Sequence, residues 1–342
     1  MSQMLQNAFG KKKNRHSRGM TAIMVIVLGA LLVWMLCNMG DIAGGIGQMK
    51  VFLKYAFIQR ALIVGALVSL CASLLGVSLV LKRYSMIGDG LSHVGFGALT
   101  IAMALGFVTV DSLPAFIPEG MRAGIAKLCT SIAASPLPFT LVIVVLCAFL
   151  LLWLSERSGM QGDSAIAIIS TSALALGVVV TSMTSGMNVD VYNYMFGSIL
   201  AMSKSDVYVS VALSVIVLAL FILFYPKIFA VTFDEAFSRA TGMKTGLYNM
   251  LIAMLTAVTV VIGMRMMGTL LISSLIIFPA LSSMRVFSRF RAVTICSAII
   301  SVSCFVVGMM LSCICSLPTG ACIVGVNLVV FMVFSVVGAL RG

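Results

Sequence analysis

Long apolar segments alternate with short polar connections along almost the whole chain. Most of these segments are about twenty residues long, which is the length that a helix needs to cross a bilayer. The sequence therefore predicts an all-α, polytopic transmembrane helical bundle with about nine to ten spans. The expected spans cover 20–39, 57–81, 88–107, 139–154, 164–184, 207–225, 247–264, 268–284, 292–312 and 320–340.

Composition and charge agree with a membrane bundle. Hydrophobic residues make up 61% of the 342 residues and charged residues only 9%, and the mean hydropathy is +1.17, which excludes a soluble globular protein. The net charge of +12 is spread over the N-terminal segment and the loop ends, so we expect membrane lipid and no nucleic acid as a partner. The distribution of Lys and Arg predicts ten crossings with both termini in the cytoplasm.

The chain divides into two regions by its pattern. Residues 1–50 hold a basic cytoplasmic tail and an extra N-terminal span, and residues 51–342 hold the main bundle. The longest connection, 108–138, contains four prolines, which we expect to prevent regular structure there. The apolar stretch 195–202 is too short to cross a bilayer and is expected to be re-entrant. The four prolines are Pro114, Pro118, Pro136 and Pro138.

Two ionisable side chains stand out inside a span. Asp89 and His93 lie four residues apart, so a helix places them on one face. Both are costly in hydrocarbon, which makes such residues a functional hypothesis by default, and together they offer a carboxylate and an imidazole to a divalent transition metal. In the alternative interpretation, Asp89 caps the helix start and His93 is a hydrogen-bonded core histidine.

The largest connection on the predicted cytoplasmic side contains a second signal. Residues 233–242 (FDEAFSRATG) begin with acidic residues and end at Gly242, which predicts a short amphipathic helix with Phe233 and Phe237 on one face. Lys and Arg do not flank the apolar face, so docking into a groove of a soluble partner fits better than lying on a lipid surface. The alternative is a loop helix that packs on its own bundle.

No catalytic machinery is visible in the sequence. The segment 242–246 (GMKTG) lacks the glycine spacing of a phosphate-binding loop, and the chain has only two histidines, His16 and His93. Most of the nine cysteines lie in apolar runs and predict no disulfide framework. We therefore expect no enzyme, and energy for any transport must come from another chain or from an ion gradient.

Several motifs resemble one known family. The run from 57 (FIQRAL) to 93 (LKRYSMIGDGLSH at 81–93) is similar to the start of the metal-transport permeases of the ABC-3 family, which are membrane subunits of ATP-driven zinc, manganese and iron importers. The resemblance extends over about 52–340 in the family's order and leaves the N-terminal span unmatched. The further motifs are SALALG at 172–177, VDVYNYMFGSILA at 189–201, FDEAFSRATG at 233–242, GTLLISSLIIFPA at 268–280 and LPTG at 317–320.

The resemblance implies a type II ABC importer permease-like fold for 51–342 and roles for particular residues. Asp89 and His93 match the family's Gly-Asp-x-Leu-x-His motif along the translocation path, and Asp190 matches an acidic position before the family's Phe-Gly-Asp motif. The segment 233–242 matches the cytoplasmic loop that meets the ATPase. The residues expected to take part in this coupling are Phe233, Asp234, Glu235, Phe237, Arg239 and Gly242.

The chain departs from the family pattern at candidate metal ligands. Ser198 and Ser316 stand where many members have Asp, and Ser170 and Thr171 replace a histidine found in some zinc members. Fewer ligands leave the metal open among zinc, manganese and iron. A sparse set suits an ion that must be released, because a closed set of four ligands would trap it.

The resemblance also implies an assembly and a location. We expect a homodimer of permeases in a bacterial-type cell membrane, bound to ABC ATPase subunits that hydrolyse ATP and to an extracytoplasmic metal-binding protein. No cofactor is expected to be permanently bound, because the divalent metal is the cargo. Two alternatives remain at this point: a permease for a metal chelate such as a siderophore or corrinoid, and an ion-coupled secondary transporter.

Overall fold

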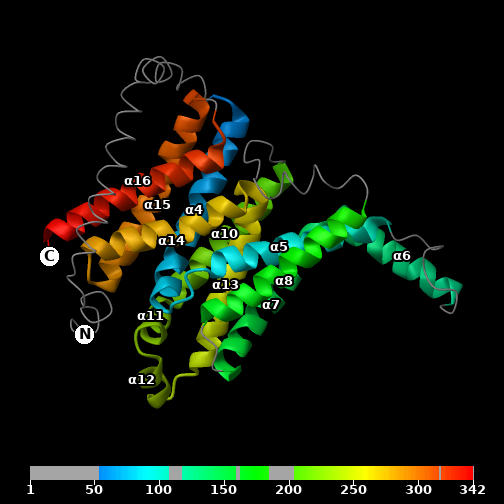
Figure 1. Cartoon of the computed structure of the whole chain (residues 1–342), viewed down its shortest axis with the longest axis horizontal. Helices are drawn as coiled ribbons and strands as arrows, with labels where there is room; N and C mark the ends of the chain where they lie inside the picture. Colours follow the sequence, from blue (N-terminus) through cyan, green and yellow to red (C-terminus); the bar gives the residue numbers. More distant parts are fainter. Residues whose placement is uncertain (1–53, 108–117, 159–161, 185–203, 316, 342) are drawn as a thin grey trace. The chain divides into compact units, whose positions relative to one another are not determined.

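The computed structural model describes residues 54–107, 118–158, 162–184, 204–315 and 317–341. These residues form helices, and no strand occurs among them (Figure 1). The expected span 20–39, the expected re-entrant piece 195–202 and Asp190 lie outside the described residues.

Each expected span between 54 and 341 corresponds to a helix. Nine helices in the described part of the chain are long and apolar enough to cross a membrane, which confirms the all-α transmembrane class. The helices are α4 (Ala56–Leu81), α5 (Ile87–Ala104), α6 (Glu119–Ala134), α7 (Pro136–Ser158), α8 (Gly162–Met183), α10 (Lys204–Leu223), α11 (Tyr225–Phe233), α12 (Glu235–Ala240), α13 (Thr245–Met267), α14 (Thr269–Val286), α15 (Phe290–Cys315) and α16 (Thr319–Arg341), with a 3₁₀ turn, η1 (Leu105–Phe107).

The expectation that prolines would keep 108–138 irregular was wrong for its second half. Helix α6 spans Glu119–Ala134, with Pro118 as its N-cap, and α7 begins at Pro136. Proline is tolerated in the first turn of a helix because the N–H that it lacks has no intrahelical partner there. These prolines therefore lie on either side of the sixteen-residue helix α6 and do not interrupt it.

The described residues belong to two compact units. Among the described residues, the first unit contains 54–80, 204–215, 274–315 and 317–341, and the second unit contains 81–107, 118–158, 162–184 and 216–273. In the first unit, the Ser301 hydroxyl of α15 donates to the Ser69 carbonyl of α4 at 2.9 Å. Small residues of this kind let membrane helices approach closely and add hydrogen bonds between them.

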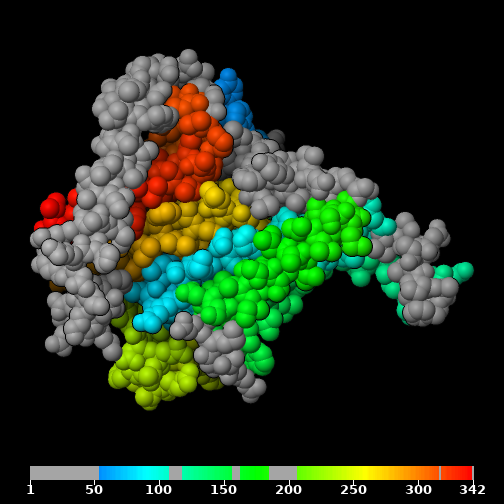
Figure 2. Space-filling model, viewed as in Figure 1, coloured from blue at the N-terminus to red at the C-terminus, as the bar shows by residue number. Residues whose placement is uncertain are grey.

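The second unit contains the helix that carries Asp89 and His93. In it α5 packs against α7, α8 and α13, and Figure 2 shows the cyan α5 lying along the green helices. Glycines on α5 make this packing close: a Cβ on Gly97 would lie 2.5 Å from the Ala173 carbonyl oxygen, and one on Gly90 would lie 2.5 Å from the Ile166 side chain. The backbone of α5 is therefore held against α8 without room for another methyl group.

The close approach of α5 and α8 leads to a stability prediction. Gly97→Ala should destabilise the fold by about 1–3 kcal/mol, because the added methyl group would force the two backbones apart. The midpoint of thermal unfolding of the purified protein should fall by about 2–4 °C for each kcal/mol.

Gly124→Ala on α6 is the matched control for Gly97→Ala. A Cβ at Gly124 would meet nothing within 4 Å, and alanine favours a helix over glycine by about 0.8–1 kcal/mol. Its midpoint should stay unchanged or rise slightly. Equal losses in both variants would show that the α5–α8 contact is not responsible.

Candidate functional site

Asp89 and His93 meet at the start of α5. The helix begins at Ile87, so Asp89 lies in its first turn, where a carboxylate is favoured by the helix dipole. The distance between Asp89 Oδ2 and His93 Nε2 is 3.5 Å. The structure thus brings together the carboxylate and the imidazole that the sequence placed on one helical face.

The surroundings of Asp89 and His93 do not fit the alternative interpretation of a helix cap and a hydrogen-bonded core histidine. The N-cap position of α5 belongs to Met86, which makes no side-chain capping bond, so Asp89 is not the cap. The His93 ring nitrogen Nδ1 is buried and finds no hydrogen-bond partner among the described residues, so His93 is not a fully hydrogen-bonded core histidine there. The Ser273 side chain lies near the Asp89 carboxylate, and its hydroxyl donates to the Thr269 carbonyl at 3.0 Å.

The exposure of the two side chains is intermediate. The Asp89 side chain is 46% exposed and the His93 side chain is 23% exposed, so both retain access to a small ion. Within the described ranges, no three His, Cys, Asp or Glu side chains gather as a group that could hold a metal. Asp190, the third residue expected on the path, lies outside those ranges.

The segment 233–242 does not form one helix as expected. Phe233 is the last residue of α11, Asp234 has an extended backbone (φ −146°, ψ 92°), and α12 covers only Glu235–Ala240. The physical cause is a cap: the Asp234 carboxylate accepts the Phe237 N–H at 2.8 Å, which starts a new helix. The prediction that Phe233 and Phe237 share a helical face was therefore wrong. Phe233 instead packs against Phe229 of α11, with ring centroids 4.9 Å apart and the ring planes tilted by 50°.

The end of α12 has the geometry that Gly242 was expected to provide. Gly242 has φ +84°, its N–H donates to the Arg239 carbonyl at 3.1 Å, and the Met243 N–H donates to the Ser238 carbonyl at 3.0 Å. These two bonds form a Schellman motif, which requires a left-handed residue at that position. The prediction that Gly242 terminates the helix is confirmed.

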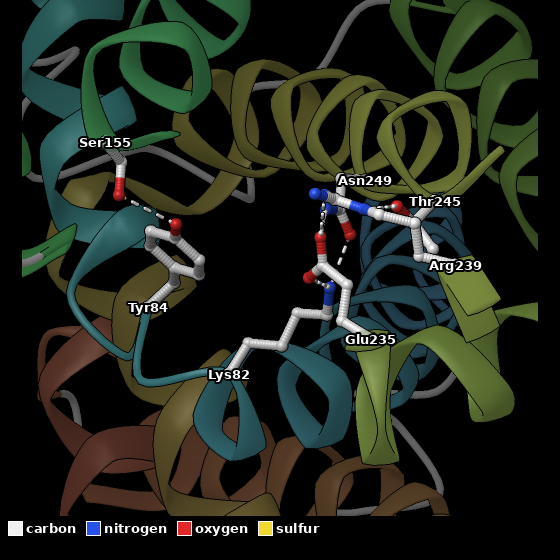
Figure 3. A network of polar contacts seen from close by, with 7 residues as sticks. All are labelled: Lys82, Tyr84, Ser155, Glu235, Arg239, Thr245 and Asn249. Atoms are coloured by element: carbon white, nitrogen blue, oxygen red, sulfur yellow. Dashed lines mark hydrogen bonds and ion pairs between the residues drawn. The ribbon is translucent and has the colours of Figure 1, made fainter. Parts of the chain in front are cut away.

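The two sides of α12 have different surroundings. The Phe237 side chain is 66% exposed, whereas Glu235 joins a polar network with residues of the same unit (Figure 3). Glu235 Oε2 accepts from Lys82 Nζ at 3.3 Å, and Glu235 Oε1 accepts from Asn249 Nδ2 at 3.1 Å. The Lys82 ammonium also donates to the Asn249 side-chain oxygen.

Arg239 and Thr245 extend this network. Arg239 Nη2 donates to Glu235 Oε1 and Arg239 Nε donates to Thr245 Oγ1, each at 3.4 Å. Arg239 itself is 70% exposed. Of the six residues expected to meet an ATPase, Asp234 therefore caps α12 and Glu235 bonds to neighbours within its own unit. The Phe237 side chain is exposed.

Contacts within the second unit agree with the expected alternation of spans. Lys82 contacts Glu235, and the Tyr84 hydroxyl is 2.9 Å from the Ser155 hydroxyl. These four residues lie in connections or at the span ends beside them. The sequence places all of these positions on the same side of the membrane. The assignment of that side to the cytoplasm rests on its positive charge.

Sequence reasoning missed Lys82, Asn249 and Ser273 as neighbours of the predicted residues. A signal was present for Lys82, because a charged residue at a span end on the same predicted side as Glu235 is a natural ion-pair partner. Asn249 is a polar residue in the first turns of an apolar span, which also indicates a tertiary partner. Nothing in the local pattern around Ser273 indicated its contact with Asp89.

Comparison with curated proteins identifies similar membrane proteins. The chain is 26% identical to the manganese transport system membrane protein MntC of Halalkalibacterium halodurans over 272 residues, which is 80% of this chain and 84% of that protein. It is 26% identical to the high-affinity zinc uptake system membrane protein ZnuB of Haemophilus influenzae over 266 residues, 77% of this chain and 91% of that protein.

Comparison with solved structures supports the same fold. The structure of PsaBC from Streptococcus pneumoniae in complex with Fab matches with a TM-score of 0.66 and 23% sequence identity, covering 88% of this chain and 100% of that chain. The sequence profile described as ABC 3 transport family matches residues 54–338. With its membrane-spanning helices, the chain therefore belongs to the ABC 3 transport family and is a membrane permease subunit of an ABC transporter.

Proposed function

We propose that this permease imports divalent transition-metal ions, with Asp89 and His93 as transient ligands on the path. The observation that carries the proposal is the Asp89–His93 pair at 3.5 Å on a membrane helix, with a buried ring nitrogen that lacks a partner among the described residues. Relatives named for manganese and for zinc transport support the class of cargo. Membership of an ABC transporter family argues against the ion-coupled secondary transporter.

The chemistry of the pair suits passage rather than storage. A carboxylate and an imidazole bind zinc, manganese and iron with useful but incomplete coordination, and water would supply the remaining positions. A transported ion needs binding strong enough to enter and weak enough to leave. Asp190 would be a further oxygen ligand in this proposal, as its place in the motif at 189–201 implies.

The proposed assembly contains chains that supply the energy and the ion. A homodimer of permeases would bind two ABC ATPase subunits, which hydrolyse ATP, and an extracytoplasmic protein would deliver the metal. The outward Phe237 of α12 supports an ATPase docking role for this helix, because exposed aromatic side chains commonly anchor protein interfaces.

Metal uptake by cells tests which ion the permease transports. Cells that lack their own zinc, manganese and iron importers would express the chain with its ATPase and binding protein, and elemental mass spectrometry would measure each metal. We expect accumulation of at least one free divalent ion, and none when the ATPase is inactive. Uptake of only a siderophore or corrinoid complex would overturn the proposal in favour of a chelate permease.

The left-handed Gly242 provides a test of the docking helix. Gly242→Ala should weaken ATPase binding about 5- to 30-fold, because a left-handed conformation costs a residue with a Cβ about 1–2 kcal/mol and the end of α12 would rearrange. The affinity is measured by titrating the purified permease with its ATPase. Gly246→Ala is the matched control, since a Cβ there meets nothing within 4 Å, and an equal loss in both variants would contradict the role of Gly242.

A further inference from the structure

The polar network around Glu235 (Figure 3) joins three separate segments of the second unit through the Glu235 carboxylate. Lys82 comes from the turn between α4 and α5, Glu235 is the first residue of α12, and Asn249 lies in α13. Both Glu235 oxygens are used, one by Lys82 and the other by Asn249 and Arg239. The network therefore links segments that are distant in sequence. An ion pair within one helix would not do so.

Partial burial makes this link more costly to break than an ordinary surface ion pair. The Lys82 side chain is 12% exposed and the Glu235 side chain is 37% exposed, and Asn249 is 8% exposed. An ion pair that is partly removed from water is screened little by salt, and loss of one partner leaves the other charge poorly compensated. The Asn249 side chain contacts both charged groups and thereby holds their relative position.

The turn that carries Lys82 is short and held at both ends. It runs from Lys82 to Met86, after which α5 starts at Ile87. Arg83 has φ +62°, the single positive value for a residue other than glycine among the described residues. The Tyr84 hydroxyl is bonded to Ser155, and a Cβ at Gly162 would lie 2.4 Å from the Tyr84 ring. A turn constrained in this way moves together with the first turn of α5.

The first turn of α5 contains the metal-ligand candidate Asp89. Only six residues separate Lys82 from Asp89, and the helical part of that distance rises about 1.5 Å per residue. A displacement of α12 would therefore pull on Lys82 and reach Asp89 through this constrained turn. No long chain of intermediate contacts is needed.

We propose that Lys82 and Glu235, supported by Asn249, transmit movement of α12 to the Asp89–His93 pair. Lys82 and Glu235 are positioning residues in this scheme, since neither contacts the ion or ATP. The inference rests on the proposed function, in which α12 docks the ATPase and Asp89 meets the metal. It assigns the transmission to one partly buried ion pair and not to α12 as a whole.

The test measures metal transported for each ATP hydrolysed by the complete transporter in proteoliposomes. Lys82→Met should retain ATPase binding and ATP hydrolysis, because Phe237 is untouched. Metal transported per ATP should fall about tenfold or more, as expected when a partly buried charge pair is broken. The reversed pair Lys82→Glu with Glu235→Lys should recover most of the ratio, because it restores opposite charges between the same two segments.

Arg83→Gln is the matched control. It removes a positive charge from the same turn, and Arg83 is exposed and outside the network of Figure 3. Its transport ratio should equal that of the wild type.

Each outcome separates the inference from the proposed function. A wild-type complex that moves no divalent metal would refute the proposed function itself. Wild-type transport with an unchanged ratio in Lys82→Met would refute only the link. Loss of ATPase binding in Lys82→Met would assign the ion pair to docking and refute the link. A reversed pair that folds and binds the ATPase but does not recover the transport ratio would also refute the link.

Discussion

Replacement of His93 by alanine should abolish ATP-driven accumulation of the metal cargo while the protein remains folded. The imidazole is one of the two candidate metal ligands that meet at the start of α5. Its Nδ1 has no hydrogen-bond partner in the described part of the chain. Removal of the imidazole therefore breaks no described hydrogen bond at Nδ1. It deletes one of the two candidate metal ligands. Loss of a group that supports a metal ligand commonly costs about 10- to 100-fold. Loss of one of the two ligands themselves should cost at least as much and reduce uptake to background. Elemental analysis of cells and ATPase assays of the purified complex measure the two effects.

Asp89→Asn and His16→Ala complete this experiment. The asparagine removes the carboxylate charge at nearly constant volume, so it should reduce uptake as His93→Ala does. His16 is the other histidine of the chain and lies in the basic N-terminal segment, so its alanine variant should transport like the wild type. Wild-type uptake of zinc, manganese and iron in His93→Ala would show that the pair is not on the path and would favour the chelate alternative.

Phe237→Ala should detach or uncouple the ATPase without unfolding the permease. The ring is 66% exposed, so its truncation removes little internal packing. An aromatic anchor at an interface typically contributes about 2 kcal/mol or more when truncated, so the affinity for the ATPase should fall at least roughly thirtyfold. Titration of the ATPase onto the permease, together with the thermal midpoint of the permease alone, measures both quantities.

Phe107→Ala is a control of matched exposure. Phe107 is 61% exposed and lies in η1, which follows the other end of α5. Its truncation should leave ATPase affinity unchanged. A Phe237→Ala transporter that keeps full ATPase stoichiometry and normal transport would remove α12 from the docking surface.

Local patterns in the sequence were sufficient for the spans and for single helix features. Apolar runs of about twenty residues form membrane helices because every backbone polar group must be bonded within the segment in lipid. The Asp89–His93 contact follows from a spacing of four residues in one helix. Gly242 was identifiable as a helix end because only glycine adopts φ +84° at low cost. Each of these depends on neighbours within one turn or one span.

Other features depended on residues that are distant in sequence. Helix α6 was missed because four prolines suggested an irregular connection. Three of them, Pro118, Pro136 and Pro138, lie at helix starts, where proline is tolerated. The break between α11 and α12 depends on how Asp234 uses its side chain: as a cap for Phe237 rather than as an acidic first residue. A charge pattern alone does not distinguish these two uses.

The sequence by itself determined the membrane class, the family resemblance, the Asp89–His93 spacing and the end of α12. Only the tertiary structure decided that Glu235 faces Lys82 and Asn249, that Phe237 is left outward, and that Ser273 contacts Asp89. The reason is physical: helix periodicity and capping depend on residues up to four positions apart, whereas Lys82 and Glu235 are 153 positions apart. Their contact exists because packing of α5 with α13, and of α13 with α12, brings those residues into one partly buried place.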